Sequence, residues 1–241
     1  MGPSRVSVRD LSTPDFDMDA ALQYFDFSGK VESHLYAAPQ PAPYCGDVIE
    51  RIEDASARGD LPAIQEAFLE LQDSPSWYFY AKAPGSALFI AIENQRTSIV
   101  AFLLKRVVTV GLSHGKIATL KRNIGVLELL LDHGWDINVQ LEWASPPPLA
   151  LAIEESHLTA WFLSHGADPN ARCLLDLTPL SAAVQYAPLP VIKSLFVYGG
   201  SINSGQLLHY AVRRDTHDAL EVLTYILAKG SPINEVMYQN H

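Results

Sequence analysis

The clearest pattern of apolar and polar positions lies in the second half of the chain and predicts two consecutive helices. In the first helix, Leu180, Ala183 and Val184 recur at helical spacing, so they define one buried face. Pro188 ends this helix because proline cannot continue the hydrogen-bond ladder. A second apolar stripe follows and stops at Gly199, where glycine adopts left-handed backbone angles without strain. The pattern therefore predicts a helix-turn-helix unit that closes on a glycine.

Four short phrases that close such units recur along the chain. Each phrase begins with glycine and ends with asparagine, and the asparagines are 32, 33 and 31 residues apart. A fixed period of this length is typical of stacked-repeat proteins, in which each unit covers the apolar face of its neighbour. The phrases are Gly134-Trp135-Asp136-Ile137-Asn138, Gly166-Ala167-Asp168-Pro169-Asn170, Gly199-Gly200-Ser201-Ile202-Asn203 and Gly230-Ser231-Pro232-Ile233-Asn234.

The start of the clearest unit resembles a known repeat. Thr178 can cap a helix with its hydroxyl, and Pro179 suits the first turn, where its missing N–H costs nothing. The phrase Thr178-Pro179-Leu180-Ser181-Ala182-Ala183 is similar to the ankyrin-repeat opening Thr-Pro-Leu-His-x-Ala. Residues 129–134 and 162–170 resemble the second helix and the closing turn of that family. For residues 46–234 the resemblance implies an all-α ankyrin-repeat solenoid of six helix-turn-helix units joined by hairpin-like loops.

Small residues occupy the same place in each first helix and predict close packing between units. A charge at this seam is expected to cost several kcal/mol. The residues are Ala55, Ala91, Ala118, Ala152, Ala183 and Ala211.

Several units depart from the repeat pattern. Val107 stands where unit two should close on glycine, and unit three has Gly115-Lys116 in place of Thr-Pro. The second helix of unit four reads as two residues short, and unit six carries about three extra residues around 215–219. We expect these units to stack less regularly, and we expect an insertion to be a place where a binding surface is modified.

Segments of different composition flank the array. Residues 1–45 form an N-terminal extension with acidic and aromatic side chains and the alternating prolines 39, 41 and 43. Two interpretations stay open for it: a mobile tail, or a segment that docks on the array or on a partner. Residues 235–241 are too few for another helix pair, so they are a tail or the start of a further unit. We expect the open C-terminal end to continue in a longer chain or to pair with another molecule. The apolar side chains expected there are Leu220, Leu223, Ile226 and Leu227.

Composition narrows the classes of partner. The 241 residues are 48% apolar and 18% charged, which predicts a real core rather than a disordered chain. The net charge of −10 argues against nucleic acid and against anionic membranes, which both need a basic surface. The chain has two cysteines, and it has neither a signal-like segment nor an apolar run that could span a bilayer. The sequence therefore predicts a cytoplasmic protein, without distinguishing the cytoplasm from the nucleus.

Candidate partner-binding residues follow from the resemblance, which implies contact through a concave groove and through the loop tips. On the first helices, the two residues after the Ala-x motif should point toward the groove, where they give a mixed order of charges. For any one of these pairs the alternative is a merely solvated face. The helix candidates are Arg58, Glu93, Asn94, Lys121, Glu154, Glu155, Gln185, Tyr186, Arg213 and Arg214. The loop candidates are Trp143, Leu174 and Leu175, whose alternative is a loop folded back onto the stack.

Motifs for catalysis are missing from the sequence. There is no glycine-rich phosphate loop, no His-Glu-x-x-His zinc helix and no Gly-x-Ser-x-Gly nucleophile turn. His133 and His165 each precede a closing glycine, where a donor side chain suits the last carbonyls of a helix. We therefore expect no catalytic, cofactor-binding or metal-binding residues.

The leading interpretation is a non-catalytic scaffold that binds another protein or peptide through the groove and the loop tips. One alternative is a regulatory or targeting module of a longer multidomain protein. Another is an atypical small-molecule-binding or enzymatic ankyrin protein. Self-association through the open C-terminal end is a further expectation.

Overall fold

The computed structural model describes residues 46–72, 85–106, 108–142, 144–173 and 175–234. The predictions for the N-terminal extension 1–45, Val107, Trp143, Leu174 and residues 235–241 fall outside this part of the chain. Within it, the helices come in pairs, and each pair is one unit of the predicted repeat. The first helices of units one to six are α2 (Gly46–Arg58), α5 (Gly85–Glu93), α7 (Leu112–Leu120), α9 (Leu149–Ala152), α11 (Pro179–Tyr186) and α13 (Leu207–Val212). The second helices are α3 (Leu61–Gln72), α6 (Thr97–Leu104), α8 (Ile124–Asp132), α10 (Ser156–Ser164), α12 (Leu189–Val197) and α14 (Ala219–Ala228).

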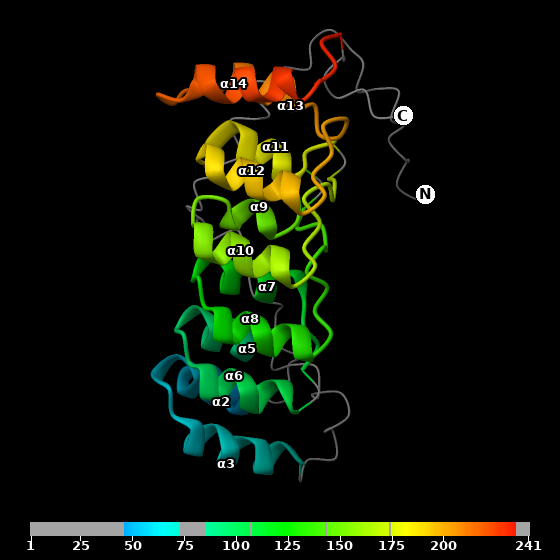
Figure 1. Ribbon diagram of the computed structural model, residues 1–241. Helices are drawn as coiled ribbons and strands as arrows, with labels where there is room; N and C mark the ends of the chain where they lie inside the picture. The colour runs from blue at the N-terminus through cyan, green and yellow to red at the C-terminus, as the bar shows by residue number, and fades with distance from the viewer. Residues whose placement is uncertain (1–45, 73–84, 107, 143, 174, 235–241) are drawn as a thin grey trace, which may run out of the picture. The chain divides into compact units, whose positions relative to one another are not determined.

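The pairs stack in chain order, as Figure 1 shows. Each first helix packs on the first helix of the next unit, from α2 on α5 through to α11 on α13. Among the second helices, α6 packs on α8 and α10 packs on α12. The predicted all-α ankyrin solenoid is therefore confirmed for the described residues.

The small residues of the first helices form the seam between units. All six are buried, with between 0% and 2% of their surface exposed. Neighbouring helix axes can approach closely only where the side chains between them are short. The seam predicted from the sequence is thus present along the whole described array. Its residues are Ala55, Ala91, Ala118, Ala152, Ala183 and Ala211.

Unit five begins as its sequence predicts. The backbone N–H of Ser181 donates to the Thr178 hydroxyl at 3.0 Å, and Pro179 occupies the first turn of α11. The Ser181 hydroxyl also donates to the carbonyl of Gly205 at 2.6 Å, so the cap reaches into unit six. A side chain at Gly205 would overlap Thr178 and Ser181, which is why only glycine fits there.

Two of the recurring asparagines, Asn138 and Asn170, join consecutive units through their side chains. The Asn138 amide donates to the Gly166 carbonyl at 3.0 Å and accepts from the Asp168 N–H at 2.7 Å. Asn170 repeats the pair one unit later, at 2.9 Å to Gly199 and 2.7 Å from Ser201. Each of these two asparagines therefore satisfies one carbonyl and one N–H of the next loop, which is a physical reason for this residue type at the period of the repeat.

Unit four corrects one prediction. Its second helix, α10, has nine residues, the same length as α8 and α12. The short element is the first helix, α9, with four residues. The Glu155 carboxylate accepts from the N–H groups of His157 and Leu158 at 3.0 and 2.5 Å, so it caps the start of α10. Unit four is therefore shortened in its first helix and not in its second.

Candidate functional site

A row of polar side chains lies at or just after the ends of the first helices, with one residue from each unit. Because these helices are consecutive neighbours, the row runs along the array from unit one to unit six. Its charges alternate at first, with Arg58 positive, Glu93 negative, Lys121 positive and Glu154 negative. We call it the helix-end row and define it as Arg58, Glu93, Lys121, Glu154, Tyr186 and Arg213.

Most of the helix-end row is accessible to solvent. Lys121 is half-buried, and Tyr186 exposes 41% of its surface. The other four residues of the row are exposed. The Arg58 guanidinium lies 3.7 Å from Asp54, but both side chains are well exposed. An exposed ion pair of this kind contributes little free energy, so it constrains Arg58 only weakly. The row can therefore present its charges to a partner.

Three neighbours of the row have different surroundings. Asn94 is exposed, although its amide donates to the Ile90 carbonyl of its own helix at 2.9 Å. Gln185 and Glu155 are half-buried. The Glu155 carboxylate caps α10, so it contributes to the helix start as well as to the surface.

Arg214 corrects a prediction, because it does not face a partner. Only 2% of its side chain is exposed. Its guanidinium donates twice to the Asp218 carboxylate, at 2.9 and 2.7 Å, and once to the Val184 carbonyl at 3.1 Å. That carbonyl belongs to the last turn of α11, where helix carbonyls lack partners. Arg214 therefore ties the inserted loop of unit six to unit five.

The same loop holds a carboxylate in its charged form. The Thr216 hydroxyl donates to Asp218 at 2.6 Å and Arg214 donates to it as well. These hydrogen bonds, that of Thr216 first, lower the pKa of Asp218 below its ordinary value. Unit six thus uses its extra residues to build a closed ion pair rather than an open binding loop.

Of the three loop candidates, only Leu175 lies in the part of the chain that the structure describes. Leu175 is half-buried, and its neighbour Cys173 is buried. Burial raises the pKa of the Cys173 thiol, so the group stays protonated and weakly nucleophilic. Leu141, in the loop before unit four, exposes only 6% of its surface and packs as part of the core.

The histidines before closing glycines act at helix ends, as the sequence indicates. The Nδ1 of His133 donates to the Leu129 carbonyl at 2.8 Å, and that of His165 donates to the Trp161 carbonyl at 2.7 Å. Both carbonyls lie in the last turns of their helices, so the prediction that these side chains suit the helix carbonyls is confirmed.

His114 is a structural residue that the sequence reasoning missed. Its Nδ1 accepts the Gly111 N–H at 2.8 Å, so its Nε2 carries the proton and donates to the Gly85 carbonyl at 2.9 Å. Burial lowers the pKa of this imidazole below its ordinary value. The neutral ring therefore joins units two and three. No signal inside unit three points to this role, because the Gly85 carbonyl belongs to another unit.

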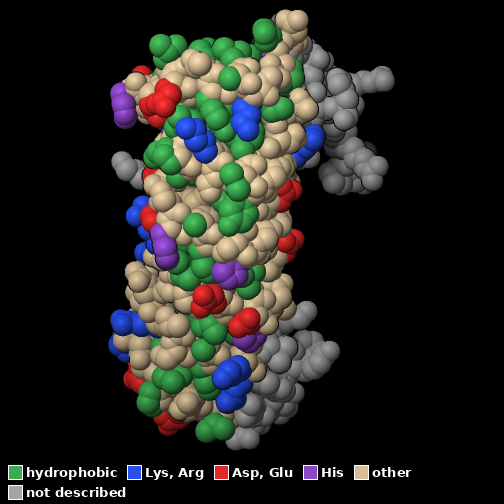
Figure 2. Space-filling model, in the orientation of Figure 1, with side chains coloured by type: hydrophobic (Ala, Val, Ile, Leu, Met, Phe, Trp, Pro, Cys, Tyr) green, Lys and Arg blue, Asp and Glu red, His purple; other side chains and the backbone are tan. Residues whose placement is uncertain are grey.

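Chemical sites are sparse in the described part of the chain. There, no group of three or more histidine, cysteine, aspartate or glutamate side chains could hold a metal ion. In the same residues no helix is long and apolar enough to cross a membrane. On the face shown in Figure 2, charged side chains of both signs are interspersed with hydrophobic ones along the array.

A groove of about 620 Å³ lies between α12 and α14, the second helices of the last two units. Leu189 and Lys193 line it from α12, and Leu220, Glu221 and Tyr225 line it from α14. Leu220 exposes 76% of its surface and Leu227 exposes 43%. These two agree with the apolar C-terminal end expected from the sequence, whereas Ile226 is fully buried and corrects that expectation.

Comparison with known proteins finds solved structures that resemble this chain, but no match at the level of sequence. No model of a known protein family matches the sequence, and no curated protein matches it. The ankyrin repeat domain of Bcl-3, a member of the IkappaB protein family, is 18% identical with a TM-score of 0.53, over 72% of this chain and 97% of that chain.

Two further solved structures give the same result. The human ASB11 ankyrin repeat domain is 22% identical with a TM-score of 0.53, over 79% of this chain and 88% of that chain. A chain from the complex of the Bdellovibrio bacteriovorus predatory endopeptidase Bd0816 with immunity protein Bd3460 is 18% identical, with a TM-score of 0.54. That match covers 75% of this chain and 93% of the other. Together with the stacked helix pairs, these similarities show that the chain has the ankyrin-repeat fold.

Proposed function

We propose that the array binds another protein as an extended segment that lies along the helix-end row. The observation that carries this proposal is the row itself: one exposed or half-exposed polar side chain in or just after the last turn of each of six consecutive first helices. A row of this kind suits a partner whose charges have the opposite order.

The geometry of the stack sets the spacing of the partner's charges. Neighbouring packed helices are about 10 Å apart, and an extended chain advances about 3.3 Å per residue. One step along the row therefore corresponds to about three residues of an extended partner. We expect an acidic residue opposite Arg58, a basic one opposite Glu93 and a repeat of this order at Lys121 and Glu154.

The far end of the row favours a different contact. Tyr186 is large, polar at one end and 41% exposed, and Arg213 is exposed in the next unit. Tyrosine and arginine are enriched among residues that dominate binding energies. The end of the row in units five and six is therefore the place where one substitution should weaken binding most.

The experiment is capture of partners by the full chain, followed by mass spectrometry. Reversing Glu93 and Glu154 to arginine together should remove the captured partner, while the helical circular-dichroism signal stays unchanged. Glu128→Arg is the matched control, because Glu128 is an exposed glutamate on a second helix, α8. Arg214 is left intact because it is buried, and its loss would disturb the fold. If the double reversal leaves the captured set unchanged, the helix-end row is not the binding surface.

A further inference from the structure

The inserted loop of unit six carries a hydroxyl that follows two arginines. Thr216 lies three residues after Arg213 and two after Arg214, and these are the one pair of adjacent arginines in the sequence. Arginine-directed protein kinases select serine and threonine hydroxyls at this distance from two arginines, because carboxylates in the kinase pair with the guanidinium groups. The sequence of the loop therefore matches the substrates of this class of enzyme.

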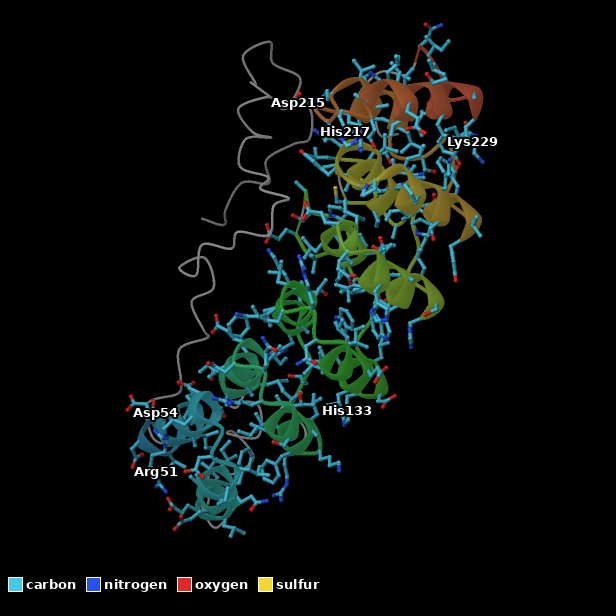
Figure 3. All side chains as sticks on the ribbon, turned by 60° about the vertical axis from the view of Figure 1, so that its left-hand side comes forward. Arg51, Asp54, His133, Asp215, His217 and Lys229 are labelled. Atoms are coloured by element: carbon cyan, nitrogen blue, oxygen red, sulfur yellow. The ribbon has the colours of Figure 1, made fainter. Side chains whose placement is uncertain are left out.

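The threonine itself is open to solvent. Thr216 and both of its neighbours, Asp215 and His217, are exposed. Figure 3 shows Asp215 and His217 at one end of α14, opposite Lys229. Thr216 lies between α13 and α14 and belongs to neither helix, so the segment around it can become extended without unwinding a helix.

The hydroxyl of Thr216 also helps to close the loop. It donates to Asp218 Oδ1 at 2.6 Å, and Arg214 donates to the same oxygen at 2.9 Å. Arg214 in turn donates to the Val184 carbonyl of unit five. We call Arg214, Thr216 and Asp218 the loop latch. A phosphate on Thr216 would remove the donated hydrogen and place about two negative charges beside the Asp218 carboxylate, so the latch and the phosphate oppose each other.

We propose that Thr216 is a phosphorylation site for an arginine-directed protein kinase, and that the phosphate opens the loop latch. The hydroxyl oxygen of Thr216 attacks the γ-phosphorus of ATP, and a new oxygen–phosphorus bond forms. The bond between the γ-phosphorus and the bridging oxygen breaks, so ADP leaves, and the hydroxyl proton passes to the catalytic base of the kinase.

The latch controls access to the arginines. Only 2% of the Arg214 side chain is exposed, so a kinase can bind both arginines only when the loop opens. Loops open locally at a lower free energy than that of global unfolding. Once Thr216 is phosphorylated, repulsion from Asp218 keeps the latch from closing again. The modification therefore converts a brief opening into a lasting one.

A phosphate at this place would change the last position of the helix-end row. Arg213 belongs to the row and lies three residues before Thr216. About two negative charges beside one positive charge would make this end of the row acidic, so a partner with an acidic side chain there would be repelled. This consequence rests on the proposed partner binding, whereas the phosphorylation site and the latch do not.

The test is incubation of the full chain with ATP and the catalytic subunit of cyclic-AMP-dependent protein kinase, followed by mass spectrometry. Phosphate should appear on Thr216 and be absent from that position in Thr216→Ala. Arg213→Ala should lower kcat/KM about tenfold, because the kinase loses one charge-assisted contact. Thr97 and Ser98 are the internal control, since both are exposed but follow a single arginine, Arg96, and they should stay unmodified.

A second pair of variants tests the latch. Asp218→Asn should raise kcat/KM about tenfold, because the loop opens more often when the ion pair is lost. Asp215→Asn is the matched control, since it removes the same charge from an exposed neighbour and leaves the three hydrogen bonds of Arg214 in place. In the phosphorylated chain the N–H of Ala219, which donates to the Thr216 carbonyl at 3.0 Å, should exchange its hydrogen faster.

Absence of phosphate from Thr216 in the full chain would overturn the proposal. If a synthetic peptide of residues 210–220 were modified in the same mixture, the folded loop would be what excludes the kinase. Unchanged hydrogen exchange at Ala219 after phosphorylation would overturn the opening of the latch. None of these measurements uses a partner, so failure here leaves the proposed partner binding to be judged by its own experiment.

Discussion

Units three and five have the same fold, but they fill the same place in opposite ways. In unit five, Leu180 of the first helix packs over Gly200 of the closing turn, and a Cβ on that glycine would lie 3.0 Å from the leucine. In unit three, the corresponding positions are Gly115 and Trp135, and a Cβ on Gly115 would overlap the indole ring. The large side chain therefore comes from the first helix in unit five and from the closing turn in unit three.

A departure from the repeat pattern at one position can be compensated by a second change in the same unit. Gly115 stands out in the sequence as the loss of a helix-opening phrase. In the structure, Trp135 is 6% exposed and occupies the space that a leucine at 115 would need. Protein interiors are close-packed, so the two positions are constrained as a pair and neither is constrained alone.

The largest expected effect comes from breaking this pair. Trp135→Gly should lower the free energy of unfolding by about 4 kcal/mol, because it leaves a cavity against Gly115. Gly115→Leu should cost about 3 kcal/mol by overlap with the indole. The double variant re-creates the arrangement of unit five, so its loss should be well below the sum of the two. Urea unfolding followed by circular dichroism measures all three.

The matched control for this cycle is Leu112→Ala on the same helix, α7. Leu112 exposes 46% of its surface, so its truncation should cost less than about 1 kcal/mol. If the losses in the double variant simply add, the two positions are independent and the comparison between the units does not hold.

A second comparison contrasts the two adjacent arginines of unit six. Arg214→Ala should cost about 3 kcal/mol, because it leaves the Asp218 carboxylate without its cationic partner and the Val184 carbonyl without its side-chain donor. Arg213→Ala should cost less than about 0.5 kcal/mol, since that side chain is exposed. Urea midpoints of the two variants measure the difference. Equal losses would contradict the structural role of Arg214.

These arginines also show that the sequence predicts the helix pairs but not the conformation of the inserted loop. The period of the repeat predicts the helix pairs, and the closing glycines 134, 166, 199 and 230 all have positive φ angles. The resemblance to the repeat family also implied a partner-facing Arg214, because a repeat pattern does not specify how an inserted loop folds. The one available signal was the spacing of Arg214 and Asp218, oppositely charged residues four apart.

Contacts between units lie beyond the pattern of any single unit. The asparagine period was clear in the sequence, but the acceptor of Asn138 is a carbonyl 28 residues away. His114 is similar, since its Nε2 reaches a carbonyl 29 residues earlier. A single-sequence pattern predicts which residues are buried within a helix pair, whereas these bonds depend on how two pairs are placed in three dimensions.

The asparagines provide the next test, with an intermediate effect. Asn170→Ala should cost about 2 kcal/mol, because the Gly199 carbonyl and the Ser201 N–H each lose a partner. Asn203→Ala should cost less than about 0.5 kcal/mol, because Pro232 stands where the N–H donor should be and has no hydrogen to donate. Hydrogen exchange of the loop amides localises each loss.

Pro232→Ser sharpens this comparison by restoring the missing N–H. In that background Asn203→Ala should become as costly as a lost hydrogen bond, about 1 kcal/mol. If Asn203→Ala is equally mild with and without Pro232, the N–H donor does not decide whether the two loops are joined.

The smallest expected effect concerns how units three and five begin. Unit five uses the hydroxyls of Thr178 and Ser181, which do not titrate, whereas unit three uses the imidazole of His114. Burial holds the pKa of folded His114 below its ordinary value of 6.5, so the unfolded chain takes up this proton first as the pH falls. The stability that the neutral ring contributes is complete above that ordinary value, and it is lost as the pH falls from there to the folded pKa. Urea midpoints measured between pH 8 and pH 5 should therefore fall more steeply for the wild type than for His114→Asn. Parallel curves would mean that Gly111 and Gly85 do not hold the ring in its neutral form.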